Sequence, residues 1–201
     1  MELHRLSTIL LCAAALSTVA MAQERLAASS HVSGTQPFHA TITGTCTNKD
    51  DFSFTGTPPG LAPGGALRIY CVVAGDSTHG RYNAQILAEG LVTANTCTSG
   101  GAGGVVGVVK AYVFVLSFTG SQDQLFLNLG SAGGSECLTP PGAIAAGQTT
   151  LNVAGGTGRF AGATGTLANR IAPIALAFSA LGGDGFFSAF SGELEGFITL
   201  K

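Results

Sequence analysis

The side chains that could hold a metal ion or transfer protons are few in this sequence and lie far apart. His31, His39 and His79 form no HxH or HExxH pattern, the spacing that places two imidazoles on one metal ion. Asp50 and Asp51 are adjacent carboxylates that could bind calcium, but such a pair in a loop is usually just solvated. We therefore predict no metal site in this chain.

Two glutamates have the spacing of a catalytic pair. Glu193 and Glu195 lie two residues apart, which places both on one face of a strand. Paired carboxylates carry out acid–base chemistry in glycosidases. The same face carries Thr199 and Lys201, whereas the alternate positions are apolar. We therefore interpret this face as solvent-exposed rather than catalytic.

The remaining polar candidates also have simple structural explanations. Arg68 and Tyr70 share a strand face but alternate with apolar residues, so we expect them to point outward. Asp76 and His79 lie in one turn, where an aspartate commonly forms the turn through its side chain. The sequence has no Gly-x-Ser-x-Gly elbow. Catalytic residues are thus unknown at this level, and if the protein is an enzyme we expect an isomerase of the cyclase type.

Four cysteines lie outside the N-terminal apolar segment. They are Cys46, Cys71, Cys97 and Cys137, and their spacing matches no CxxC-type metal motif, which argues against zinc. An even number of cysteines in an exported chain predicts two disulfide bonds. Three pairings are possible in principle.

The N-terminus has the three parts of a secretory signal peptide. His4 and Arg5 are basic, Ser7–Val19 is apolar and uncharged, and Ala20-Met21-Ala22 is a small-x-small cleavage site. We expect a signal peptide over residues 1–22, a flexible leader over 23–35 and one domain over 36–201. The protein is accordingly expected to be secreted or periplasmic.

Composition indicates strands and turns rather than long helices. The chain has 30 glycines among 201 residues, and charged residues make up only 10 % of it. The net charge is −2, and the lysines and arginines form no basic stripe, which argues against a nucleic-acid partner.

Several segments alternate apolar and polar residues with the period of a strand. Ala66–Ala74, Arg81–Glu89 and the C-terminal run from Phe186 to Leu200 each have one apolar face. Val105–Phe118 is apolar on both faces and is expected to be deeply buried or to form a long bent strand. Ser131–Gly147 is expected to be the longest loop. About eight antiparallel strands separated by turns predict a closed barrel or a sandwich.

One predicted hairpin bears on the disulfide pairing. Gly120-Ser121 suits a two-residue turn with glycine first. Continuing that register places Cys137 opposite Gly104, close to the loop that starts at Cys97. We therefore favour Cys97–Cys137, which leaves Cys46–Cys71.

The segment Val153–Gly165 reads Val-Ala-Gly-Gly-Thr-Gly-Arg-Phe-Ala-Gly-Ala-Thr-Gly. A strand followed by Gly-Gly-Thr-Gly is similar to the phosphate-binding turn of dinucleotide folds. However, Gly162 and Gly165 disfavour the helix that such a turn requires, and no strand–helix alternation surrounds the segment. We therefore expect no dinucleotide and no other cofactor.

The same segment more closely resembles the signature of the allene oxide cyclase-like and dirigent-like β-barrels, especially their poorly characterised exported bacterial members. The matching residues are Gly-Gly-Thr-Gly-x-Phe and the following Ala-x-Gly. The resemblance implies an eight-stranded antiparallel β-barrel with an apolar interior, so that the fold class expected is all-β. It also implies structural roles for seven residues, namely Gly155, Gly156, Thr157, Gly158, Phe160, Gly162 and Gly165.

Each part of this signature has an expected structural task. Gly155, Gly156 and Gly158 are expected to form a tight turn with positive φ. Phe160 is expected to return to the core, and Gly162 and Gly165 to let a strand bend in the barrel wall. No matching catalytic acid, arginine or tyrosine set is found, so the activity of the plant families is not transferred to this chain.

Three classes of function remain. The first is a non-enzymatic exported barrel that binds a small apolar ligand or has a surface or structural role. The second is a cyclase- or isomerase-like barrel that confines an apolar intermediate and steers its ring closure. The third is an outer-membrane barrel, but the sequence has no tryptophan and only three tyrosines for its aromatic girdles. We predict the first class, with the second as the alternative, and no stable membrane insertion. The sequence does not determine the oligomeric state.

Overall fold

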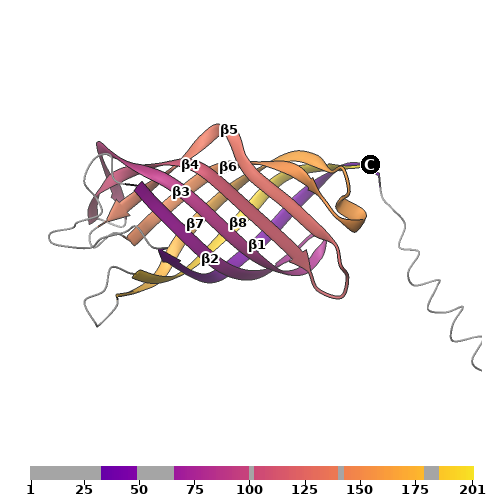
Figure 1. The fold of residues 1–201 in the computed structure, drawn as a ribbon, viewed down its shortest axis with the longest axis horizontal. Coiled ribbons are helices and arrows are strands. Elements are labelled where there is room, and N and C mark those ends of the chain that lie inside the picture. Colours follow the sequence, from indigo (N-terminus) through magenta and orange to yellow (C-terminus); the bar gives the residue numbers. More distant parts are fainter. Residues whose placement is uncertain (1–32, 49–65, 100–101, 140–142, 179–185) are drawn as a thin grey trace, which may run out of the picture. The chain divides into compact units, whose positions relative to one another are not determined.

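Eight antiparallel strands form a closed barrel (Figure 1). The structure, a computed structural model, describes residues 33–48, 66–99, 102–139, 143–178 and 186–201. These belong to one compact unit, Ser33–Lys201. The strands are β1 (Gly34–Asn48), β2 (Ala66–Ser77), β3 (Gly80–Ser99), β4 (Ala102–Phe118), β5 (Gln124–Thr139), β6 (Ala143–Gly156), β7 (Thr164–Phe178) and β8 (Phe186–Leu200). The predicted all-β, eight-stranded antiparallel barrel is therefore confirmed.

Each strand pairs with its neighbour in sequence, and β8 pairs with β1 to close the wall. β1 begins at Gly34, two residues before the expected start of the domain. The expected signal peptide and residues 23–32 of the expected leader lie outside the described residues. Among the residues described, no helix is long and apolar enough to cross a membrane.

The alternation read from the sequence is present in the wall. On β8, Leu194 and Ile198 are buried, whereas Glu193 and Glu195 are exposed. Burial alternates in the same way along β3 from Tyr82 to Ala88. Inward side chains are removed from water while outward ones remain solvated, and this is what the period-two pattern predicts for a barrel.

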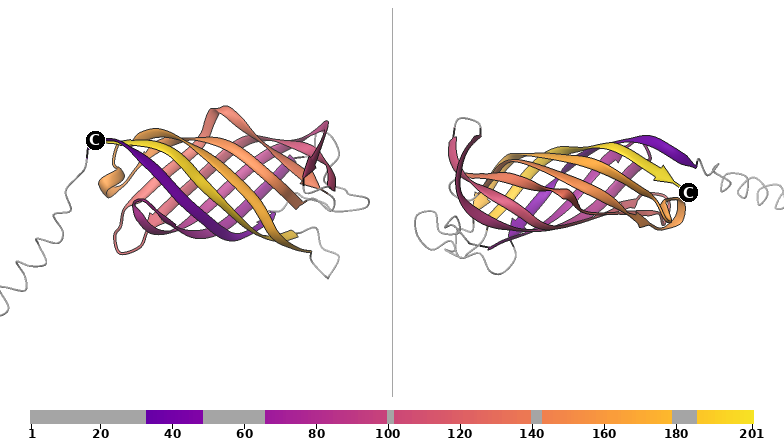
Figure 2. Two further views of the ribbon diagram at one scale, coloured as in Figure 1. Left: turned by 180° about the vertical axis from the view of Figure 1, so that it is seen from behind. Right: turned by 90° about the horizontal axis from the view of Figure 1, so that it is seen from above.

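The barrel has two different ends (Figure 2). At the turn end, the β2–β3, β4–β5 and β6–β7 connections meet the start of β1 and the C-terminus, where Gly34 pairs with Leu200. The opposite, disulfide end is where Cys46–Cys71 joins β1 to β2 and Cys97–Cys137 joins β3 to β5. The favoured cysteine pairing is therefore confirmed.

The turn and the strand register from which this pairing was predicted are partly wrong. Phe118 N donates to Asp123 O (3.0 Å), so the predicted two-residue turn is a wider loop. Cys137 faces Val106 rather than Gly104, because β5 has five residues (129–133) where β4 has three (110–112) between paired stretches. This β-bulge shifts the register by two, and Figure 1 shows β5 arching out of the wall.

One other expectation was wrong, and of the two alternatives for Val105–Phe118 the long strand is confirmed. The predicted long loop over Ser131–Gly147 consists mostly of strand, since β5 continues to Thr139 and β6 begins at Ala143. Val105–Phe118 lies in one long strand, but it is not buried on both faces, because Val113 is 49 % exposed on the outer wall.

Large side chains fill the half of the lumen nearest the turn end. Phe38, Tyr82, Phe114 and Phe160 are all fully buried there. Tyr82 Oη donates to the carbonyl oxygen of Thr41 (2.7 Å), which satisfies the one polar atom these rings bring into the core. An eight-stranded barrel is just narrow enough for side chains to fill it, and this half is filled.

We predict that Phe160→Ala destabilises the protein by about 3–5 kcal/mol, because it empties a fully buried position in the packed half. Phe197→Ala is the matched control, since Phe197 is 62 % exposed, and should cost less than about 1 kcal/mol. Denaturant unfolding of both variants measures the difference. Equal losses of unfolding free energy in the two variants would show that Phe160 is not packed in the barrel core.

Candidate ligand site in the barrel lumen

The signature segment forms the connection between β6 and β7 and holds the neighbouring turn. Thr157 Oγ1 accepts from Gln124 N (2.9 Å) and donates to Gln122 O (3.0 Å). Gly158 has φ +56°, and a Cβ there would overlap the Asp123 carboxylate. Glycine is therefore required at position 158 by both backbone conformation and space.

Other parts of the signature differ from expectation. Gly155 has the expected positive φ (106°), whereas Gly156 is not among the positive-φ glycines of the described residues. Gly156 instead lies where a Cβ would meet Gln124 O and Phe160 Cβ. Gly162 and Gly165 were both expected in a bent strand. Gly165 does lie in a strand, β7, whereas Gly162 lies in the turn before it. Phe160 returns to the core as expected.

A cluster of rings and charges closes the turn end. The Arg159 guanidinium lies over the rings of Phe118 (4.9 Å) and Phe160 (5.0 Å) and forms an ion pair with Asp123 (Nε–Oδ2 3.2 Å). Arg159 Nη2 also donates to the carbonyl oxygen of His79 (2.9 Å). Burial, reinforced by the charge of Arg159, lowers the pKa of His79. These contacts hold three turns together, and we interpret the cluster as structural.

The other residues singled out in the sequence are not brought together. His39, Glu193 and Glu195 are exposed on the outer wall. Arg68 pairs with Glu89 (3.0 Å) across β2 and β3. Asp76 pairs with Arg81 (3.4 Å) beside its own turn. His31, Asp50 and Asp51 lie outside the described residues. Within the described part of the chain, no three histidine, cysteine or acidic side chains are grouped to hold a metal ion.

A polar layer that the sequence analysis missed lies inside the barrel. It consists of Tyr112 on β4, Glu136 on β5, Thr149 on β6 and Asn169 on β7, all buried. Asn169 Nδ2 donates to Tyr112 Oη (3.1 Å), and β5 and β6 lie between the two strands that carry them. This bond therefore links inward-pointing side chains from non-adjacent strands.

Glycines surround Glu136 on both sides in the sheet. Its partner on β4 is Gly107, and its partner on β6 is Gly147. Next along the same row are Ile171 on β7 and Gly192 on β8. The carboxyl side chain consequently has no side chain beside it on either neighbouring strand, and this part of the lumen is less filled than the turn half.

Two hollows reach Glu136. One is a small cavity of about 10 Å³ walled by Ile69, Ala88 and Val109. The other is an open groove of about 420 Å³ that Val106, Ile171 and the Cys97–Cys137 disulfide help to line. The small cavity has room for about one water-sized group. Glu136 therefore lines both a small cavity and an open groove.

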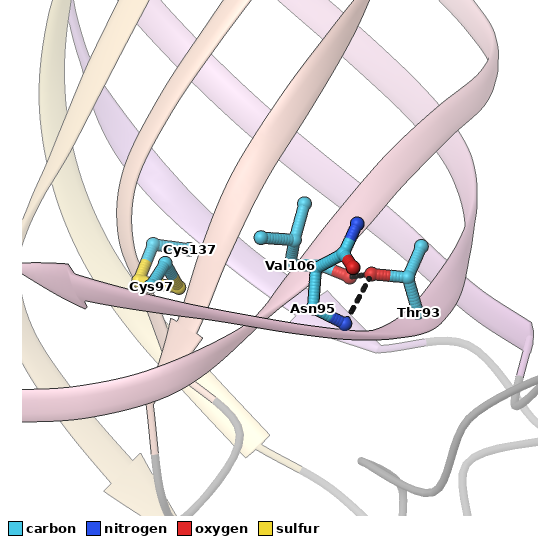
Figure 3. The surroundings of a disulfide bond; sticks show 5 residues. All are labelled: Thr93, Asn95, Cys97, Val106 and Cys137. Carbon is cyan, nitrogen blue, oxygen red and sulfur yellow. Dashed lines mark hydrogen bonds between the residues drawn. A yellow bond between two sulfur atoms is a disulfide. The ribbon is translucent and has the colours of Figure 1, made fainter.

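Figure 3 shows the Cys97–Cys137 bond, whose two residues also line the groove. Val106 lies close to the Cys97–Cys137 bond. Thr93 Oγ1 donates to the carbonyl oxygen of Val106 (2.9 Å) and accepts from Asn95 N (3.2 Å). These bonds fasten the end of β3 to β4 where the regular pairing between the two strands shifts. The apolar border of the groove is thus held by covalent and hydrogen bonds.

Two side chains of the polar layer have a polar group that no described residue satisfies. Asn169 is 1 % exposed, and its Oδ1 accepts no hydrogen bond. Glu136 is 6 % exposed, and no hydrogen bond or ion pair among the described residues reaches its carboxyl group. A buried polar group without a partner costs on the order of 1–3 kcal/mol or more, so its presence calls for an explanation.

The surroundings of Glu136 change its proton affinity. Burial raises the pKa of its carboxyl group to about 7. Burial also raises the pKa of Tyr112, and the charge of Glu136 raises it further, which places the two groups within electrostatic reach of each other. A carboxyl group that titrates near neutral pH can both give and take a proton, and so it could serve as an acid or a base.

Comparisons with known proteins give no family for this chain. None of the protein-family models searched matches it. A search of curated proteins likewise finds no matching relative.

We predict that Glu136 makes stability depend on pH. Its pKa is raised from 4.5 to about 7 on folding, so the folded state holds a proton that the unfolded state releases. The contribution is fully present below pH 4.5 and is lost as pH rises through about 7, by about 3 kcal/mol in total.

Denaturant unfolding between pH 4 and 8 measures this effect as the difference between the wild type and Glu136→Gln. His79 has the opposite effect, because its lowered pKa makes the folded state less stable at acid pH. Both proteins contain His79, so its contribution cancels in the difference. Parallel stability curves for the two proteins would contradict the prediction.

Proposed function

We propose that this protein is an exported barrel that binds a small, largely apolar ligand in its lumen, between the polar layer and the disulfide end. The observation that carries the proposal is Glu136, a buried carboxyl group between two glycines that has no partner among the described residues. A purely structural barrel gains nothing from such a group, whereas a ligand can satisfy it.

Export is supported by the cysteines and the wall. Disulfide bonds persist in oxidising compartments, and the structure pairs all four cysteines of the barrel. His39, Arg170, Glu193 and Glu195 are exposed on the outside of β1, β7 and β8, as suits a barrel surrounded by water. We therefore propose a secreted or periplasmic protein, with a signal peptide over residues 1–22. Membership of the allene oxide cyclase-like or dirigent-like barrels remains part of this proposal and rests on the signature segment.

A cyclase- or isomerase-like activity is the second candidate. One observation favours it: a carboxyl group with a pKa near 7 lies within electrostatic reach of the Tyr112 hydroxyl. Such a pair could move a proton to or from a bound apolar intermediate while the barrel wall fixes the shape of the product. Turnover of the ligand, rather than binding alone, distinguishes this candidate from the first.

We predict that the wild-type protein, purified without detergent from an exporting host, carries a small molecule in native mass spectrometry and enhances the fluorescence of N-phenyl-1-naphthylamine. Gly147→Val should lose both signals, because its side chain would occupy the space beside Glu136 and Ile171. Gly103→Val is the matched control and should keep both, since nothing lies within 4 Å of a Cβ there.

A wild type with neither signal would contradict ligand binding and favour a surface or structural role. Recovery of a ligand that has changed chemically after incubation would favour the isomerase.

A further inference from the structure

Two side chains of the polar layer present acceptor atoms that no donor among the described residues reaches. Asn169 Oδ1 accepts nothing, and the Glu136 carboxyl group meets no donor among the described residues. Tyr112 Oη accepts one hydrogen bond from Asn169 and keeps a second lone pair. Three side chains in one layer thus present free acceptor positions, and one of them becomes negatively charged when it loses its proton.

We propose that the polar end of the ligand is a primary ammonium group on an apolar body. This inference rests on the proposed function and specifies its ligand. An ammonium group has three N–H donors and no acceptor, so it can donate to the Glu136 carboxyl group, which lines both hollows, without needing a donor in return. Its charge would pair with the Glu136 carboxylate, and a buried carboxylate is stable only when it is paired. A carboxylate ligand would leave Asn169 Oδ1 and Glu136 without donors and add a second negative charge.

The two hollows suit the two parts of such a molecule. The cavity of about 10 Å³ beside Glu136 accepts a group of the size of water, and an ammonium group is about that size. The groove of about 420 Å³ has Val106, Gly147 and Ile171 in its lining and can receive an alkyl or aryl body. Glu136 lines both spaces, so a molecule that spans them would place its charged end at the carboxyl group.

The charges around Glu136 are compatible with a cation. Within the lumen the titratable group in reach is Tyr112, which stays neutral because its pKa is raised. Glu89 on β3 lines the small cavity and pairs with Arg68. Arg170 on β7 lines the open groove, is exposed, and lies 3.5 Å from Glu195 on the outer wall. The two arginines beside these hollows, Arg68 and Arg170, thus already have acidic neighbours.

The test compares three probes with the same eight-carbon chain: octylamine, 1-octanol and octanoate. Isothermal titration calorimetry of the disulfide-bonded protein at pH 8 should show octylamine binding at least about tenfold more tightly than octanol, as expected for a desolvated ion pair. Lowering the pH to 5 should remove the preference, because a proton then competes for the same carboxyl group.

Glu136→Gln should lose the amine preference at pH 8 while it still binds octanol. The control Glu193→Gln, which changes an exposed carboxylate on the outer wall, should keep it. Near-ultraviolet circular dichroism confirms that each variant is folded. If octanol binds as tightly as octylamine in the wild type, the ammonium inference is wrong and the ligand-binding function stands.

Tightest binding of octanoate would also overturn the inference and point to Arg170 as the polar anchor. Failure of all three probes to bind, in a wild type that also carries no small molecule, would overturn the proposed function together with it.

Discussion

Closure of the sheet is the constraint on which the rest of this structure depends. Eight strands enclose a lumen that inward side chains can just fill, so the residue at each inward position decides whether the interior is packed or open. Aromatic rings such as Phe38 and Phe160 fill the turn half. Toward the disulfide end, Gly107, Gly147 and Gly192 occupy inward rows and leave space around Glu136. The same barrel wall therefore encloses one half packed with aromatic side chains and another half where glycines leave space beside Glu136.

The packed turn half and the two disulfide bonds stabilise the barrel on either side of Glu136. Arg159 joins the three turns at one end through His79, Asp123 and two aromatic rings. At the other end, one disulfide bond joins β1 to β2 and the other joins β3 to β5. A carboxyl group can remain buried without a partner only where the surrounding structure supplies the stability that this group removes.

Much of the fold could be predicted from the sequence, because period-two alternation is a direct consequence of one wet and one buried face. The strand face of Leu194 and Ile198 was found in this way, and the pairing Cys97–Cys137 followed from the hairpin expected at Gly120-Ser121. The register near Cys137 was not, since a bulge within a glycine-rich stretch has no distinctive composition.

The candidate site was missed for the same reason. Glu136 lies in the glycine-rich segment Ser131–Gly147, whose composition predicts a loop, so the sequence does not indicate its inward orientation. Asn169 does alternate with Leu167 and Ile171, and that pattern could have placed it inside the barrel. Its approach to Tyr112 depends on barrel closure, which brings β4 and β7 face to face across the lumen and leaves no local sequence signal.

The central claim is that the Glu136 carboxyl group is buried in the lumen and has no partner among the residues that the structure describes. Carbon-13 NMR of its Cδ, assigned by comparison with Glu136→Gln, follows its protonation directly in the folded protein. A titration midpoint near pH 7 is the expected result, because burial raises its pKa to about 7. A midpoint close to the ordinary value of 4.5 would show that the carboxyl group is solvated or paired, and would contradict the account.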